Sequence, residues 1–324
     1  MVSNRTVPHD GNRRHGSLFD KKKMHMLKHI LVPLDGSKLA EAALPVAAYL
    51  ALTLKAPVTL LHVIEQDAPE EIHRDRHLTD SVESEAYLAE TARHAFSPKV
   101  KVDWHVHTAA VADVARSIVD HSADEFQPDL ILLCAHGNSG MRDFFFGNIA
   151  QQVAAASGTP VLLIKPNTSP VPLKMKRILL PLDNESIHDK AIPIAEELAK
   201  AFKAQLDLLC VIPTLGTLSG VQAASGNLMP TTTTAYLDIA EEIAQEHFQA
   251  HLDEFHKIGL SATAEIVRGD PAPVIAKTAE IFGANLIIFG THGRSGLGAF
   301  WNRSVAASVA RRTQIPILLI PLPE

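Results

Sequence analysis

Two glycine-rich stretches contain residues that could bind a phosphate group. The stretch Gly290–Ser304 reads GTHGRSGLGAFWNRS; it follows an apolar run and precedes a segment of helical character. A strand, a glycine-rich turn and a helix in that order bring backbone N–H groups together, and the helix N-terminus adds partial positive charge. Glycine matters there because a side chain would keep the backbone away from a ligand. The sequence therefore predicts a phosphate-binding loop.

The second stretch, Cys134–Asn148, reads CAHGNSGMRDFFFGN and aligns with the first without a gap. The chain repeats itself elsewhere too. Asp35 and Asp183 each follow the first apolar run of one half, 148 residues apart (183 − 35), and Gly137 and Gly293 lie 156 residues apart (293 − 137). A period near 150 residues is too long for a solenoid repeat and indicates a duplicated domain.

Strand-like and helix-like segments alternate within each half, which is typical of a parallel sheet covered by helices on both faces. We therefore expect an α/β chain of two tandem Rossmann-like domains, each with a five-stranded parallel sheet. The expected division is a disordered basic tail at residues 1–27, domains at 28–166 and 177–322, and a linker at 167–176. Ligands of such sheets bind beyond the strand C-termini, where the strand order reverses. Both aspartates and both glycine loops fall at such ends.

Four local expectations concern the elements themselves. Pro45 lies inside a helical pattern and should kink that helix. Thr108–Val111 is expected to be a loop, and strand Asn285–Phe289 to end before the glycine loop. The insertion Pro213–Thr234, rich in Gly, Ser and Thr, should precede a helix that begins at Ala235.

Composition narrows the class of protein. The 324 residues are 46% hydrophobic and 20% charged, and the net charge of −6 gives no basic field for nucleic acid. No apolar run reaches the ~18 residues of a membrane span, and the basic N-terminus lacks an apolar signal core. Cys134 and Cys210 lie in different halves, so we expect two buried, reduced thiols. These features predict a cytoplasmic protein with neither nucleic-acid nor membrane partners.

The ordered motifs resemble the universal stress protein family, of the tandem two-domain kind. ILVPLDGS, LLHV and FFFGNIAQQVAAASGTPVLLIK carry the resemblance in the first half, and ILLPLDNES, LLCVI, RGDPA and RSVAASVARRTQIPILLI carry it in the second. It covers roughly residues 28–321. It implies a fold like that of the adenine nucleotide alpha hydrolases and a role in the stress response.

The resemblance also implies a nucleotide site in each half, for ATP or a related adenine nucleotide that Mg²⁺ could accompany. In the nucleotide-binding branch of the family the phosphate motif is glycine, two residues, glycine, nine residues, then glycine and Ser or Thr. The early aspartate contacts the adenosine part, and a valine at the second strand contacts the base. The candidate nucleotide-binding residues are Pro181, Asp183, Val211, Gly269, Gly290, Gly293, Arg303, Ser304 and Val305 in the second half, and Pro33, Asp35, Val63, Gly137, Gly147 and Asn148 in the first.

Both copies depart from that motif. Arg303 replaces the last glycine of the second copy, while Cys134 and Asn148 replace a glycine and the Ser or Thr of the first. The guanidinium of Arg303 could pair with phosphate oxygens, or it could occupy their place. Two functions therefore stay open: a nucleotide-binding switch, and a nucleotide-free scaffold that acts through protein partners.

Neither catalysis nor a metal site is predicted. The sequence has no G-x-S-x-G, no GxxxxGK[ST] and no HExxH motif, so we expect at most slow ATP hydrolysis. His136 and His292 lie in the glycine loops, where acid–base catalysis is a weaker third hypothesis. The HRDRH cluster around His73 is typical of solvated charge, and His105 and His107 share one strand face, which permits chelation without indicating it.

The last strand of each half points to assembly. Val161–Ile164 and Ile317–Ile320 are apolar and would leave unpaired edges. In the family these strands pair across a dimer. Within one tandem chain they could pair with each other and form a pseudo-dimer, while a homodimer through the outer faces is a further expectation.

Overall fold

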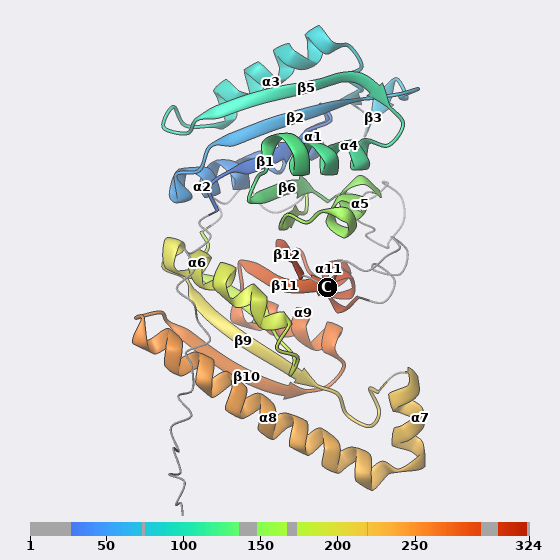
Figure 1. The fold of residues 1–324 in the computed structure, drawn as a ribbon, viewed down its shortest axis with the longest axis vertical. Coiled ribbons are helices and arrows are strands. Elements are labelled where there is room, and N and C mark those ends of the chain that lie inside the picture. The colour runs from blue at the N-terminus through green and yellow to red at the C-terminus, as the bar shows by residue number, and fades with distance from the viewer. Residues whose placement is uncertain are drawn as a thin grey trace, which may run out of the picture.

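The computed structural model describes residues 27–72, 75–135, 148–166, 174–218, 220–292 and 304–322. Figure 1 shows two similar halves stacked along the long axis of the molecule, with the first half in blue to green and the second in yellow to red. Their strands form one ten-stranded sheet in the order β10-β9-β8-β11-β12-β7-β6-β1-β2-β5. None of the described helices is long and apolar enough to cross a membrane.

The first half supplies strands β1 (Ile30–Pro33), β2 (Val58–Glu65), β5 (Val102–Val111), β6 (Leu130–Cys134) and β7 (Val161–Ile164) to this sheet. Its helices are α1 (Lys38–Glu41), α2 (Leu44–Leu54), α3 (Ser81–Ala95), α4 (Val114–Asp120), the π-helical turn η1 (His121–Phe126) and α5 (Asn148–Ala156). A short hairpin, β3 (Glu71–Ile72) and β4 (Asp75–Arg76), precedes α3.

The second half supplies strands β8 (Arg177–Pro181), β9 (Gln205–Ile212), β10 (Ala262–Arg268), β11 (Leu286–His292) and β12 (Ile317–Leu322). Its helices are the 3₁₀ turn η2 (His188–Ala191), α6 (Ile192–Phe202), α7 (Gly220–Leu228), α8 (Pro230–Lys257), α9 (Pro271–Phe282) and α11 (Val305–Arg312). The predicted fold class is confirmed, because each half contains five parallel strands and helices cover both faces.

Two hydrophobic cores lie on opposite faces of the sheet. Buried side chains of α2, α3, α6 and α8 pack on one face, and those of α4, α5, α9 and α11 pack on the other. Neighbouring residues of a strand point to opposite faces. In β1, for example, Ile30 and Val32 enter the first core and Leu31 enters the second. Each core contains residues from both halves of the chain.

Strands β7 and β12 join the two halves. They pair antiparallel, with Ile317 opposite Leu163 and Leu318 opposite Leu162. The predicted pairing of the two terminal strands within one chain is therefore confirmed. The β2–β5 and β9–β10 pairs form the outer ends of the sheet (Figure 1).

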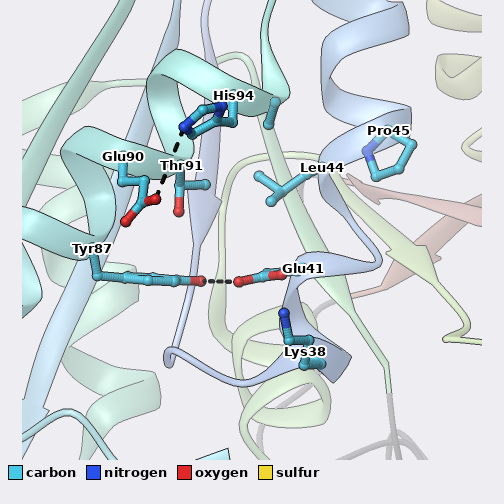
Figure 2. A pocket seen from close by; sticks show the side chains of 9 residues that line it. Lys38, Glu41, Leu44, Pro45, Tyr87, Glu90, Thr91 and His94 are labelled. Carbon is cyan, nitrogen blue, oxygen red and sulfur yellow. Dashed lines mark hydrogen bonds and ion pairs between the residues drawn. The ribbon is translucent and has the colours of Figure 1, made fainter.

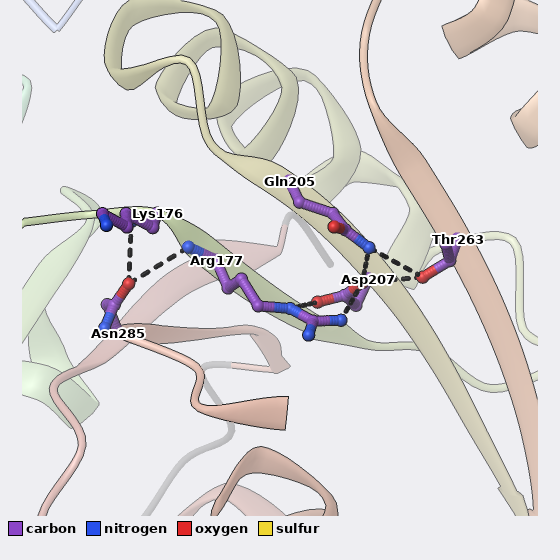
Figure 3. A network of polar contacts seen from close by, with 6 residues as sticks. All are labelled: Lys176, Arg177, Gln205, Asp207, Thr263 and Asn285. Atoms are coloured by element: carbon purple, nitrogen blue, oxygen red, sulfur yellow. Dashed lines mark hydrogen bonds and ion pairs between the residues drawn. The ribbon is translucent and has the colours of Figure 1, made fainter. Parts of the chain in front are cut away.

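A polar network fixes the amino ends of three strands in the second half (Figure 3). The fully buried Asp207 on β9 receives two hydrogen bonds from the Arg177 guanidinium, at 2.9 and 3.0 Å. Gln205 and Thr263 donate to the same carboxylate at 2.8 and 2.6 Å. This network ties β8, β9 and β10 together at the end opposite the predicted site.

The structure corrects four local expectations. Ala42 and Ala43 separate α1 from α2, and Pro45 lies in the first turn of α2, where its missing N–H costs no hydrogen bond, so the helix is broken rather than kinked. The expected loop Thr108–Val111 is the end of β5, because it continues beside the end of β2.

The other two corrections lengthen elements. Helix α8 begins at Pro230 rather than Ala235, since proline fits a first helical turn, and the insertion also folds into α7. Strand β11 continues to His292, because β12 reaches Leu322 and keeps pairing with it. Gly290 therefore lies in a strand, not in the turn that follows.

Candidate functional site

The sheet topology brings the predicted aspartate and glycine loop of each half to adjacent strand ends. The strand order reverses between β1 and β6 in the first half, and between β8 and β11 in the second. In the second half Leu179 lies opposite Ile287, an offset of 108 residues (287 − 179). Asp183 follows the end of β8 by two residues, and Gly290 lies near the end of the neighbouring strand β11. This is the position where open parallel sheets bind ligands.

Asp183 is half-exposed and carries a negative charge. Its Oδ1 accepts hydrogen bonds from His188 Nδ1 at 2.7 Å and from the Glu185 N–H at 2.9 Å. Burial alone would raise the pKa of Asp183, but the bonds from His188 and Glu185 outweigh it and hold that pKa below its usual value. The hydrogen bond to Asp183 in turn raises the pKa of His188. Asp183 thus remains an ionised acceptor, which suits a hydroxyl group as donor.

Ser304 stands at the N-cap of α11. Its backbone is extended, with φ −77° and ψ 135°, and its side chain makes no capping hydrogen bond with the helix. Val305, which follows, begins α11 and is 41% exposed. The N–H groups of the first turn and the partial positive charge of the helix N-terminus lie beside Ser304. This end of α11 can attract an anion.

Four further predicted residues of the second half lie in strands or directly after them. Pro181 ends β8, and Val211 lies half-buried near the end of β9. Gly269 adopts φ +155°, and a Cβ there would lie 2.7 Å from Val274. A Cβ on Gly290 would lie 3.1 Å from the Leu322 side chain, so close packing also accounts for this glycine.

In the first half, Asp35 shapes a turn after β1. Its Oδ1 accepts from the Ser37 N–H at 2.9 Å and the Ser37 hydroxyl at 2.7 Å, and Ser37 caps α1 through the Ala40 N–H. Pro33 ends β1 and Val63 lies buried in β2.

Cys134 occupies the position of the first motif glycine, yet it is buried in the core. Burial and the nearby charge of Asp35 raise the pKa of the Cys134 thiol to about 12. Cys210 is also buried, and both cysteines are free thiols, as predicted. Asn148 begins α5. Cys134 therefore remains a neutral, unreactive group at neutral pH.

Several predicted residues lie outside the described part of the chain: Gly137, Gly147, Gly293 and Arg303, together with His73 and His136. The two alternatives for Arg303 therefore both stay predictions.

A cavity of about 680 Å³ lies elsewhere, between α1, α2 and α3 in the first half (Figure 2). Tyr87 donates a hydrogen bond to Glu41 across it at 3.2 Å, and burial together with the Glu41 charge raises the pKa of Tyr87. None of the candidate nucleotide-binding residues lines this cavity.

Three groups of side chains among the described residues have donor atoms close enough together to hold a metal ion. They are His105 with His107 and His121, Asp189 with His247 and His251, and Asp183 with Glu185 and His188. Sequence reasoning found the pair on β5 but missed His121, which η1 supplies. It also missed the second group, whose only sequence signal is the four-residue spacing of two histidines on one helix.

Comparison with known proteins agrees with this architecture. The model of the Universal stress protein family matches residues 26–165 and 174–321. Universal stress protein Rv2623 of Mycobacterium tuberculosis is 24% identical over 306 residues, which cover 90% of this chain and 95% of that protein. Universal stress protein MJ0577 of Methanocaldococcus jannaschii is 31% identical over 163 residues, 44% of this chain and 98% of that protein. A universal stress protein structure from Archaeoglobus fulgidus covers 92% of this chain and 98% of its own, with TM-score 0.62 and 16% identity.

Proposed function

The chain belongs to the universal stress protein family, and we propose that its second half binds ATP or a related adenine nucleotide, as a switch and not as a fast enzyme. The observation that carries this proposal is the position of the ionised Asp183 and the N-terminus of α11 at the same switch point of the sheet. A ribose hydroxyl can donate to Asp183 while the phosphates face α11.

The described residues fit such a ligand in a second respect. The Ser304 hydroxyl makes no capping bond with α11, so it is available to donate to a phosphate oxygen. The family motif has Ser or Thr at this place. Mg²⁺ would come with the phosphates, since this ion keeps several waters and binds mainly through phosphate oxygens.

Calorimetry of the full chain with Mg-ATP tests the proposal. We expect binding that Ser304→Ala weakens about tenfold to hundredfold, because a hydrogen bond to a charged group contributes about 1.5–3 kcal/mol. Ser261→Ala makes the same chemical change at an exposed serine outside both predicted sites, so it is the matched control and should leave this affinity unchanged. Absence of heat at millimolar nucleotide, together with absence of co-purified nucleotide by mass spectrometry, would refute the proposal.

Arg303→Ala separates the two alternatives for Arg303. A lower affinity indicates that the guanidinium pairs with phosphate oxygens, and a higher affinity indicates that it occupies their place.

The second candidate is a nucleotide-free scaffold that acts through protein partners. Exposed apolar side chains on α7 and α8 favour it: Leu228 is 82% exposed, Tyr236 66% and Ile239 53%. Large exposed apolar groups in a row are more frequent at protein interfaces than elsewhere on a surface. If calorimetry shows no binding of Mg-ATP, the scaffold function replaces the nucleotide-binding function.

A further inference from the structure

Three side chains from two elements converge between η2 and α8, and none of them belongs to the proposed nucleotide site. His247 Nε2 lies 2.9 Å from Asp189 Oδ2 and 3.0 Å from His251 Nε2. The third side of the triangle, from His251 Nε2 to Asp189 Oδ2, is 3.8 Å. Two imidazole nitrogens and one carboxylate oxygen thus face a common centre.

The fold holds these groups in place. His247 and His251 are one turn apart on α8, so they project side by side. The neighbouring Phe248 and Phe255 are buried and fix the rotation of the helix. On the other side, Asn184 donates to the Ala240 carbonyl at 2.8 Å and anchors the segment before η2 to α8. The two histidines are 23% and 13% exposed, so solvent reaches the site only at its edge.

Hydrogen bonds alone do not account for this arrangement. A ring N–H points in one direction, so His247 Nε2 cannot donate to both Asp189 and His251 with full strength. In addition, the buried Asp189 Oδ1 has no hydrogen-bond partner among the described residues. A buried acceptor without a partner is costly, and an ordered water or an ion is what usually satisfies it.

We propose that Asp189, His247 and His251 bind one divalent transition-metal ion of the zinc class. Zinc–nitrogen and zinc–oxygen bonds are about 2.0–2.2 Å, so donor atoms around a tetrahedral ion are ~3.3 Å apart. The observed separations of 2.9, 3.0 and 3.8 Å bracket that value. Imidazole nitrogens suit zinc, copper, iron or nickel, whereas Mg²⁺ and Ca²⁺ prefer oxygen ligands. A water molecule completes the coordination.

The ion would connect η2 to α8 at the outer side of the second half. Asp189 directly follows His188, the partner of Asp183. The metal therefore fixes the segment that carries the proposed adenosine contact, although its binding does not depend on a nucleotide.

Zinc titration of the chelator-treated full chain tests the site. Two other groups could take up zinc. The His105 and His107 rings lie with their centroids 5.3 and 4.8 Å from that of His121, and Asp183, Glu185 and His188 form the third group, so the parent protein carries His105→Ala, His107→Ala and Glu185→Ala. We expect the parent to bind one Zn²⁺ per chain and to give tetrahedral Co²⁺ absorption bands. His251→Ala should lower the zinc affinity at least about a hundredfold and abolish the bands.

His256→Ala is the matched control, since His256 is exposed on the same helix. It should bind zinc as the parent does. Circular dichroism of the metal-free proteins checks that they fold. If His251→Ala unfolds, Asp189→Asn replaces it, because asparagine keeps the size of the side chain. The proposal fails if the parent takes up no zinc, or if His251→Ala and Asp189→Asn both bind it as tightly as the parent.

Discussion

Lys165 places a buried ammonium group at the junction of the two halves. Its Nζ donates to the Thr313 carbonyl at 2.6 Å, at the C-terminal end of α11, where the helix dipole favours a cation. Burial nevertheless lowers the pKa of Lys165 from 10.5 to about 8. The Lys165 ammonium group is therefore charged at neutral pH although its burial disfavours the charge.

Lys165 should make stability rise with pH above neutrality. Between pH 8 and 10.5 the folded protein releases this proton while the unfolded chain keeps it, so the free energy of unfolding increases across that window. Below pH 8 both states are protonated and the full cost remains. Urea denaturation at pH 7.5 and pH 10 should show Lys165→Met losing this increase, on the order of 2–3 kcal/mol. Equal pH slopes for the two proteins would contradict the argument.

At the scale of elements, Asp207 holds the amino ends of β8, β9 and β10 together (Figure 3). Asp207→Ala removes the partner of Arg177, which also stacks on the Phe282 ring at 4.8 Å. Because the Arg177 side chain is 32% exposed and water can solvate it, the main cost is that of the buried donors left without their acceptor, about 1–3 kcal/mol. We expect that decrease in the free energy of unfolding, measured by denaturant titration.

Asp103→Ala provides the comparison. Asp103 forms an ion pair with Lys101 at 2.9 Å on the outer strand of the first half, but both side chains are exposed. Exposed pairs contribute about 0–1 kcal/mol, so this variant should be close to the wild type. Equal losses for the two variants would show that burial does not determine the cost.

The elements follow largely from local patterns. Apolar spacing with flanking glycine or proline predicts helices at Pro271–Phe282 and Val305–Arg312 and a strand at Gln205–Ile212. The structure has the same bounds. The element bounds that were predicted wrongly depend on pairing with segments that are distant in the sequence. Gly290 joins β11 only because β12 extends to Leu322.

The candidate sites also differ in how far the sequence predicts them. The strand ends near Asp35 and Asp183 are predictable, since topology places them at switch points. The Asp189 cluster is not, because His247 lies 58 residues away in the sequence and no periodicity connects them. Likewise, the role of Asp183 as acceptor for His188 depends on how the 3₁₀ turn η2 folds.

At the scale of the whole molecule, the two halves share their cores. Both hydrophobic clusters contain residues from either half, and β7 and β12 make the sheet continuous. One hydrogen bond and one aromatic contact add to this: the Leu27 N–H donates to Glu197 at 2.9 Å, and the ring centroids of Tyr49 and Phe202 lie 5.1 Å apart. Halves coupled in this way should not unfold separately, in contrast to domains joined only by a linker.

We therefore predict one cooperative unfolding transition for the full chain. The two tryptophans offer separate probes: Trp104 lies on β5, and Trp301 lies between β11 and α11 in the sequence, outside the described residues. Trp301→Phe and Trp104→Phe each leave one probe, and their urea curves should coincide in midpoint and slope. Leu162→Asp, opposite Leu318 in the central strand pair, should shift both curves together to lower urea. Two separate midpoints, or a shift of the Trp104 curve alone, would show that the halves are independent and that the β7–β12 pairing does not couple them.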